Sequence, residues 1–194
     1  MSFIPTLVFL ALLAACVRHD LRARRIPNAV VFPGMLAALA LHAFLPAGMG
    51  LFCASIGTPM GGLGLASGLG GLALGLAFLM PLYALRLMGA GDVKMLAMAG
   101  AFVGAGQVLA LTLATLLAGG VLALVVAARQ RKLRQLVANA GQMVAHTGLS
   151  ALAGVAAPVP APAAASGRLP YAVAIAVASV ACVLWLRTHG ALPL

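Results

Sequence analysis

The chain contains only two acidic residues, Asp20 and Asp92, in its 194 positions. Two carboxyl groups held close together cannot easily both ionise, so they share a proton and titrate as a coupled pair. The ionised member can take a proton from water as that water attacks a peptide carbonyl, while the protonated member donates to the carbonyl oxygen. The two residues therefore predict a catalytic aspartic dyad that needs no metal and no cofactor, and their types do not decide which one is the acid.

Asp92 lies in the segment "MGAGDVKM", where several neighbours could support such a site. Gly89 and Gly91 allow tight turns and a close approach of a substrate backbone. Asp92 is expected to begin a helix, whose N-terminal dipole favours the ionised carboxylate; the alternative is that it is only an N-cap. Lys94 either biases the charge of the pair, holds a lipid phosphate or extends its ammonium group to the membrane interface.

Asp20 lies in the segment "VRHDLRARRIPN", among four arginines. The alternative to catalysis is that Asp20 serves as a surface counter-ion for these arginines. Pro27 and Asn28 begin the next apolar segment, where the geometry of a helix start explains them about as well as a role in the site. The four histidines show no metal-ligand spacing, and only His19 adjoins either carboxylate.

The elements that must position these residues are membrane helices. The chain is 64% hydrophobic and 7% charged, with a mean hydropathy of +1.15, which excludes a soluble globular domain. We expect one all-α, polytopic membrane bundle with apolar segments near residues 3–17, 28–45, 63–85, 93–104, 107–128 and 169–186. The fourth segment would reach only about 18 to 21 Å, so it should start inside the bundle, meet a thinned bilayer or be re-entrant.

Basic residues predict the orientation of this bundle. Six crossings put the loops 18–27, 86–92 and 129–168 on one side, and all of the twelve Lys and Arg residues except Arg187 fall on or beside that side. The positive-inside rule makes it cytoplasmic, with both termini outside. Asp20 and Asp92 then lie at the cytoplasmic ends of their spans, where acidic residues are usually functional.

Three further features complete the predicted single domain, residues 1–194. Residues 129–152 carry apolar side chains at helical spacing after a basic run, which predicts a helix in the membrane interface. Residues 153–167 are rich in Ala and Pro and are expected to be a flexible linker. Close helix packing is predicted for glycines at three- or four-residue steps, Gly64, Gly68, Gly71 and Gly75.

Three stretches resemble the type IV prepilin peptidases, a family of G-x-G-D membrane aspartyl proteases. They are "DLRARRIPN" from Asp20, "GAGDVKM" from Gly89 and "LPYAVAIA" from Leu169, which contains Pro170 and Tyr171. The resemblance implies that Asp20 and Asp92 cut short basic leaders from prepilins or pseudopilins at the cytoplasmic face of the bacterial inner membrane. Tyr171 either places its hydroxyl near the pair or is an interfacial aromatic anchor.

The resemblance is to a short form of the family. Many members carry two C-x-x-C pairs in an N-terminal cytosolic domain linked to methylation, and this pattern does not occur here. The short form resembles the peptidases of tight-adherence (Flp) pilus systems, so we expect no methyltransferase activity and no S-adenosylmethionine.

Two other functions are compatible with membrane acids. One is a transporter that moves protons or cations, which predicts acids near the middle of the bilayer. The other is a non-enzymatic subunit of a pilus or secretion machine, which predicts that either Asp can be replaced by Asn without loss. The expected partners are prepilin precursors, membrane lipids and the pilus assembly machinery; nucleic acid is not expected, because the basic residues sit in short clusters between apolar segments.

Overall fold

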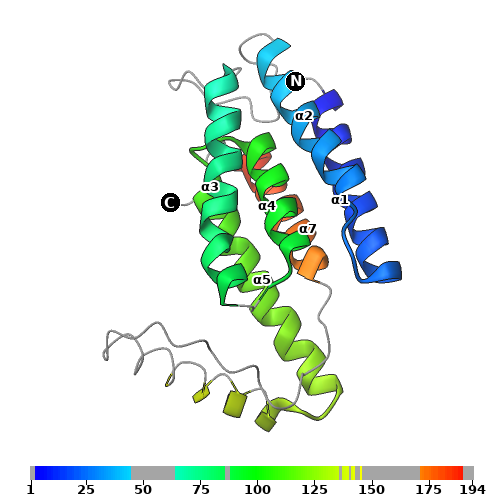
Figure 1. The fold of residues 1–194 in the computed structure, drawn as a ribbon, viewed down its shortest axis with the longest axis vertical. Helices are drawn as coiled ribbons and strands as arrows, with labels where there is room; N and C mark the ends of the chain where they lie inside the picture. Colours follow the sequence, from blue (N-terminus) through cyan, green and yellow to red (C-terminus); the bar gives the residue numbers. More distant parts are fainter. Residues whose placement is uncertain are drawn as a thin grey trace.

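The computed structural model describes residues 3–44, 64–85, 88–135, 137–139, 141–142, 145 and 171–189. In this part of the chain six long helices are present: α1 (Phe3–Ala23), α2 (Asn28–Phe44), α3 (Gly64–Ala84), α4 (Ala90–Val103), α5 (Val108–Arg129) and α7 (Tyr171–His189). Successive helices run in opposite directions, so the ends of α1 and α3 lie beside the starts of α2 and α4, while α5 continues past the start of α7 (Figure 1). The predicted fold class, an all-helical membrane bundle, is confirmed.

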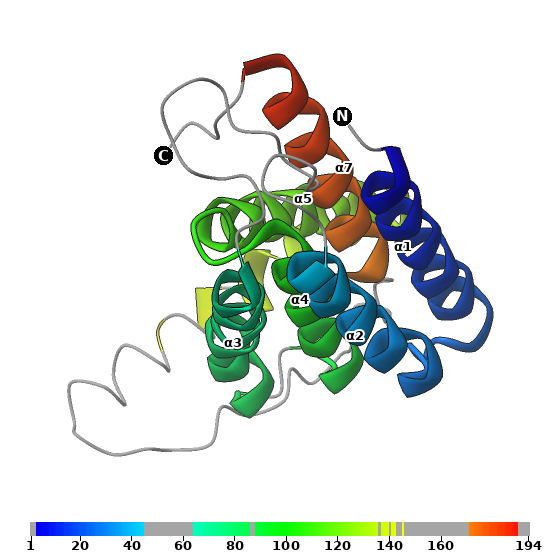
Figure 2. The same ribbon diagram turned by 90° about the horizontal axis from the view of Figure 1, so that it is seen from above.

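The shortest of these helices, α4, is the centre of the bundle. It contacts each of the other five, and these form a ring in the order α1, α2, α3, α5, α7, with α7 returning to α1 (Figure 2). Every residue of α4 from Val93 to Val103 is buried except Lys94. A helix that is apolar all round needs to be covered on every side, and here the covering is protein.

Glycines allow the backbone of α3 to lie directly against α4. A Cβ atom added at Gly71 would overlap the carbonyl of Gly100, and one added at Gly75 would lie 3.0 Å from the Cα of Ala97. One added at Gly68 would lie 2.8 Å from the His42 ring on α2. The predicted close packing is thus confirmed at these three glycines, whereas Gly64 has open space around it and a φ of 65°.

The C-terminal end of α4 is satisfied by polar groups from neighbouring helices. Nε2 of His42 lies 2.9 Å from the carbonyl oxygen of Ala101, and the helix ends at Gly104 with a φ of 81°. The N–H of Ala105 donates to the carbonyl oxygen of Ser67 at 3.1 Å. Because unpaired backbone groups are costly inside a membrane, these bonds allow a helix of only 14 residues to end within the bundle.

Two helices, α3 and α5, are long and apolar enough to cross a membrane by length and composition, and α2 and residues Tyr171–Trp185 are shorter apolar helices. α1 continues past the apolar segment predicted to end at Val17 and stops at Ala23. Asp20 is therefore helical and not part of a loop from residue 18 to 27, as the sequence suggested. Hydropathy marked the end of the apolar stretch, but Arg and Leu continue a helix readily.

Some predicted features fall wholly or partly outside the described residues. Residues 133–135, 137–139, 141–142 and 145 are helical, but the interfacial helix over 129–152 as a whole stays a prediction. The linker 153–167 and Pro170 lie outside the described part of the chain.

Candidate active site

Asp20 is a buried carboxylate in the last turns of α1, with only 8% of its surface exposed. The backbone N–H of Ala172, in the first turn of α7, donates a hydrogen bond to it. Its Oδ2 atom has no hydrogen-bond partner within the described residues. Burial raises the pKa of Asp20, and both the Ala172 N–H and the positive charge of Arg24 oppose that rise.

Asp92 is the third residue of α4, and the N-cap of this helix is Gly89. The alternative that Asp92 is itself the N-cap is therefore wrong. Its carboxylate accepts a hydrogen bond from the N–H of Gly89, which is the return half of a capping box. Burial raises the pKa of Asp92 to about 6; the charge of Asp20 adds to the rise, and the Gly89 N–H opposes it.

The two carboxylates lie at the same end of the bundle, where α1 ends and α4 begins (Figure 1). They are close enough for the charge of Asp20 to raise the pKa of Asp92. Each carboxylate also accepts an N–H bond at the N-terminus of a helix, Asp92 from Gly89 at the start of α4 and Asp20 from Ala172 at the start of α7. Backbone N–H groups at these positions carry partial positive charge. Burial favours the neutral form of each carboxyl group, and the N–H groups favour the charged form. These opposing effects are compatible with a pair in which one carboxyl group is protonated and the other is ionised.

The turn between α1 and α2, residues 24–27, fastens the two acidic segments together. Arg24 has a φ of 52°, and its N–H donates to the Asp20 carbonyl at 2.8 Å, which ends α1 in a sharp turn. Ile26 then packs on Gly91, where a Cβ atom would lie 3.2 Å from the Cβ of Ile26. Pro27 follows, and its carbonyl accepts the N–H of Val30 at 3.1 Å at the start of α2. The two sequence motifs thus pack against each other.

Lys94 makes a second link across the same junction. Its Nζ atom donates to Oδ1 of Asn28 at 3.1 Å and lies 5.5 Å from the ring centroid of Phe32, both on α2. A cation above an aromatic face is attracted to it. Lys94 therefore ties the first turn of α4 to the first turn of α2, a role that its place in the sequence did not reveal.

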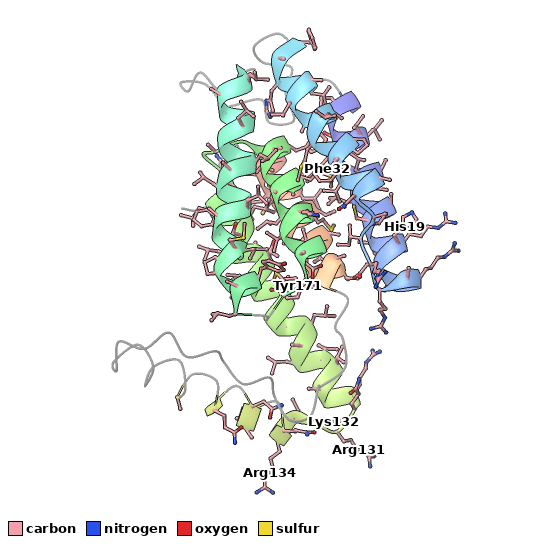
Figure 3. The ribbon with its side chains drawn as sticks, in the orientation of Figure 1. His19, Phe32, Arg131, Lys132, Arg134 and Tyr171 are labelled. Carbon is pink, nitrogen blue, oxygen red and sulfur yellow. The ribbon has the colours of Figure 1, made fainter. Side chains whose placement is uncertain are left out.

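The third motif reaches the site through Tyr171, the first residue of α7. Tyr171 lies within range of the charge of Asp92, and its neighbour Ala172 binds Asp20. The ring packs on Gly119 of α5, where a Cβ atom would be 2.6 Å from Cε2 and Cζ. By contrast, His19 is exposed on the outer side of α1 (Figure 3), away from the buried carboxylate beside it in sequence.

Several residues at this site escaped the sequence analysis. Ala172 acts through its backbone, which leaves no signal in the side-chain sequence. Ile26 and Gly119 act through packing. The one available signal was the Gly119–Gly120 pair inside an otherwise apolar helix, because glycine in a helix interior is unfavourable and often has a packing reason.

Comparison with known proteins gives one result for this arrangement. The family model described as "Type IV leader peptidase family" matches residues 7–124, a range that contains both aspartates and the turn between α1 and α2. α7 lies beyond the matched residues. Searches of curated proteins and of solved structures give no match.

Proposed function

The chain belongs to the type IV leader peptidase family, and on this premise we propose that it is an aspartic endopeptidase that removes the leaders of type IV or Flp-type prepilins. The observation that carries the proposal is the electrostatic coupling of Asp20 and Asp92, the only acidic residues of the chain. A coupled pair of carboxyl groups, of which Asp20 is buried and Asp92 half-buried, can activate water without a metal. Membership of the family makes the chain a protease in general; the aspartic type and the Flp-type substrate are the proposed part.

In the proposed reaction Asp20 is the base and Asp92 the acid. Burial raises the pKa of both carboxyl groups, but Arg24 and the Ala172 N–H favour the ionised form of Asp20. The charge of Asp20 further raises the pKa of Asp92, to about 6, against the opposing Gly89 N–H. Water attacks the scissile carbonyl carbon and gives a proton to Asp20, as Asp92 gives its proton to the carbonyl oxygen. As the C–N bond of the resulting gem-diol breaks, Asp20 gives its proton to the leaving nitrogen and Asp92 takes a proton from one hydroxyl group. The products are a carboxylic acid and an amine, and the pair again holds one proton, on Asp92.

Asp20 carries an oxygen suited to this task. Its Oδ2 atom is buried and without a hydrogen-bond partner in the described part of the chain. Because buried polar atoms are normally paired, a free acceptor next to a second carboxyl group supports a role in accepting the proton of water. Gly89, Gly91 and Lys94 hold the first turn of α4, and Tyr171 begins the helix that binds Asp20.

The charges around the site support cleavage at the cytoplasmic face of the inner membrane. Arg22, Arg24 and Arg25 are exposed at the end of the bundle that carries the two acids. Arg131, Lys132 and Arg134 are exposed beyond the same end, past α5 (Figure 3). Cations collect on the cytoplasmic side of membrane proteins and attract anionic lipids. The proposed partners are therefore prepilin or pseudopilin precursors, anionic membrane lipids and the pilus assembly machinery.

The position of the two acids also favours a protease over a transporter. Asp20 follows the apolar stretch of α1, and Asp92 lies in the first turn of α4, so both are at one end of the bundle. A proton or cation path requires acids near the middle of the bilayer.

Co-expression with a candidate prepilin tests the proposal. Asp20→Asn and Asp92→Asn should each abolish the shift in pilin size on a gel, because each removes one half of the proton-sharing pair. His19→Asn is the matched control, since His19 adjoins Asp20 but is exposed on the outer side of α1. Membrane insertion of all variants is checked in parallel. Normal processing by both Asp variants would refute the assignment and favour a non-enzymatic assembly subunit.

A further inference from the structure

Two adjacent glycines of α5 have different surroundings. A Cβ atom added at Gly119 would overlap the Tyr171 side chain, at 2.6 Å from both Cε2 and Cζ, whereas one added at Gly120 would meet no atom within 4 Å. Gly119 is buried and Gly120 is exposed. The missing side chain at Gly119 therefore forms a notch in α5, and the Tyr171 ring fills it.

The notch is connected to the proposed active site through consecutive residues. Tyr171 is the first residue of α7, and the next residue, Ala172, donates its N–H to the Asp20 carboxylate. α7 packs against both α5 and α1. The Tyr171 ring in the notch and the Ala172 N–H on Asp20 are therefore joined through one peptide bond at the start of α7.

We propose that Gly119 is a positioning residue for the active site: its notch seats the Tyr171 ring and so holds the Ala172 N–H on Asp20. The inference rests on the proposed peptidase function and extends it to α5, which carries neither acid. Tyr171 acts in this arrangement through its ring and the backbone that follows it.

Loss of the Ala172 hydrogen bond has a defined effect on Asp20. Within the described residues, the charged groups that interact with this carboxylate are Arg24 after α1 and Asp92 on α4, and Tyr171 on α7 lies within range of the charge of Asp92. The Ala172 N–H lowers the pKa of Asp20, so its withdrawal raises that pKa. The acidic limb of the pH–rate profile, which reports the ionised base, should then move to higher pH.

The test compares Gly119→Ala with Gly120→Ala in the full-length chain, reconstituted in vesicles of phosphatidylethanolamine and phosphatidylglycerol with a purified prepilin. Gly119→Ala should lower kcat by about tenfold to a hundredfold with little change in KM, since a shift of about 1 Å at a catalytic group has effects of this size. It should also move the acidic limb upward. Gly120→Ala should match the wild type in both respects. Equal behaviour of the two variants would overturn the proposal.

A second variant covers the case in which Gly119→Ala does not fold. Tyr171→Leu empties the notch without adding an atom to α5, and it should reproduce the loss in kcat and the shift of the acidic limb. Gly119→Ala introduced into the Tyr171→Leu chain should then cause no further loss, because the overlapping ring is gone. An equal loss in both backgrounds would show that Gly119 does not act through Tyr171.

The outcomes separate the two proposals. If the wild-type chain leaves the prepilin uncut, the proposed function fails. If the wild-type chain cuts it and Gly119→Ala behaves as Gly120→Ala does, only the positioning role fails.

Discussion

Nζ of Lys94 lies 3.1 Å from Oδ1 of Asn28, and this bond joins the first turn of α4 to the first residue of α2. Together with the contact between Ile26 and Gly91, it brings two segments more than sixty residues apart in sequence into one structural unit. Asp20 lies shortly before Ile26 and Asn28 in the sequence. Asp92 lies between their partners, Gly91 and Lys94. The separation of the two carboxylates therefore depends on how firmly this junction is held.

This dependence predicts coupled effects at Lys94 and Asn28. Lys94→Met and Asn28→Ala should each lower kcat several-fold. The double variant should be no worse than Lys94→Met alone, because that change already removes the bond to Asn28. A double-mutant cycle on kcat, with a coupling of about 0.5 to 1 kcal/mol, measures this. Phe32→Leu, which removes only the cation–π contact, is the control. Additive losses would show that the two side chains act separately.

The carboxyl group of Asp92 predicts how stability changes with pH. Its pKa in the folded chain is about 6, above its ordinary value of 3.8, because burial and Asp20 disfavour its charge. The folded state therefore binds the proton more tightly, and the stability this provides is complete below pH 3.8 and is lost as the pH rises through 6. Asp92→Asn stays neutral, so it should become more stable than the wild type across this window.

Thermal unfolding in detergent from pH 4 to pH 8 measures this difference. The gap in Tm between Asp92→Asn and the wild type should grow as the pH rises towards 6 and then level off. It should correspond to about 3 kcal/mol at neutral pH, because each pKa unit between 3.8 and 6 is worth about 1.4 kcal/mol. A gap that is constant with pH, or that shrinks as the pH rises, would contradict the burial of a charged Asp92.

The contact between Gly71 and Gly100 predicts that one added methyl group at residue 71 lowers the stability of the fold. Gly71→Ala would place a Cβ atom on the Gly100 carbonyl, and backbone atoms cannot rotate away as a flexible side chain can. Overpacking of this kind should lower the free energy of unfolding by about 1 to 3 kcal/mol. Gly120→Ala is the matched control and should preserve or raise Tm, because its Cβ meets open space and Ala favours a helix. Equal Tm values for both variants would refute the close approach.

Much of the architecture followed from the sequence. The spacing of Gly68, Gly71 and Gly75 indicated close helix packing because small residues repeated on one helix face leave room for a neighbour. Alternating spans placed Asp20 and Asp92 at one end, and the structure has both there. The bounds of the helices differ from the predicted segments mainly in α1, where charged residues continue the helix.

The sequence could not show which helix is central. Hydropathy describes each segment separately, and the apolar surface of α4 would suit lipid as well as protein. The partner of Gly119 was equally hidden, because a sequence shows a missing side chain but not the Tyr171 ring that occupies its space. The Ala172 N–H is free to bind Asp20 because it lies in the first turn of α7. Its position is therefore set by the fold and not by the type of its side chain.

The ring around α4 has a consequence for biosynthesis. The ring of helices is closed by the contact between α7 and α1. α7 also supplies the Ala172 N–H that binds Asp20. A chain is made from its N-terminus onward, so both aspartates are synthesised before α7 and before this contact can form. A chain that has not yet made α7 leaves one side of α4 uncovered and lacks the Ala172 N–H that binds Asp20. We therefore expect cleavage of prepilin to begin only after α7 has been synthesised and packed.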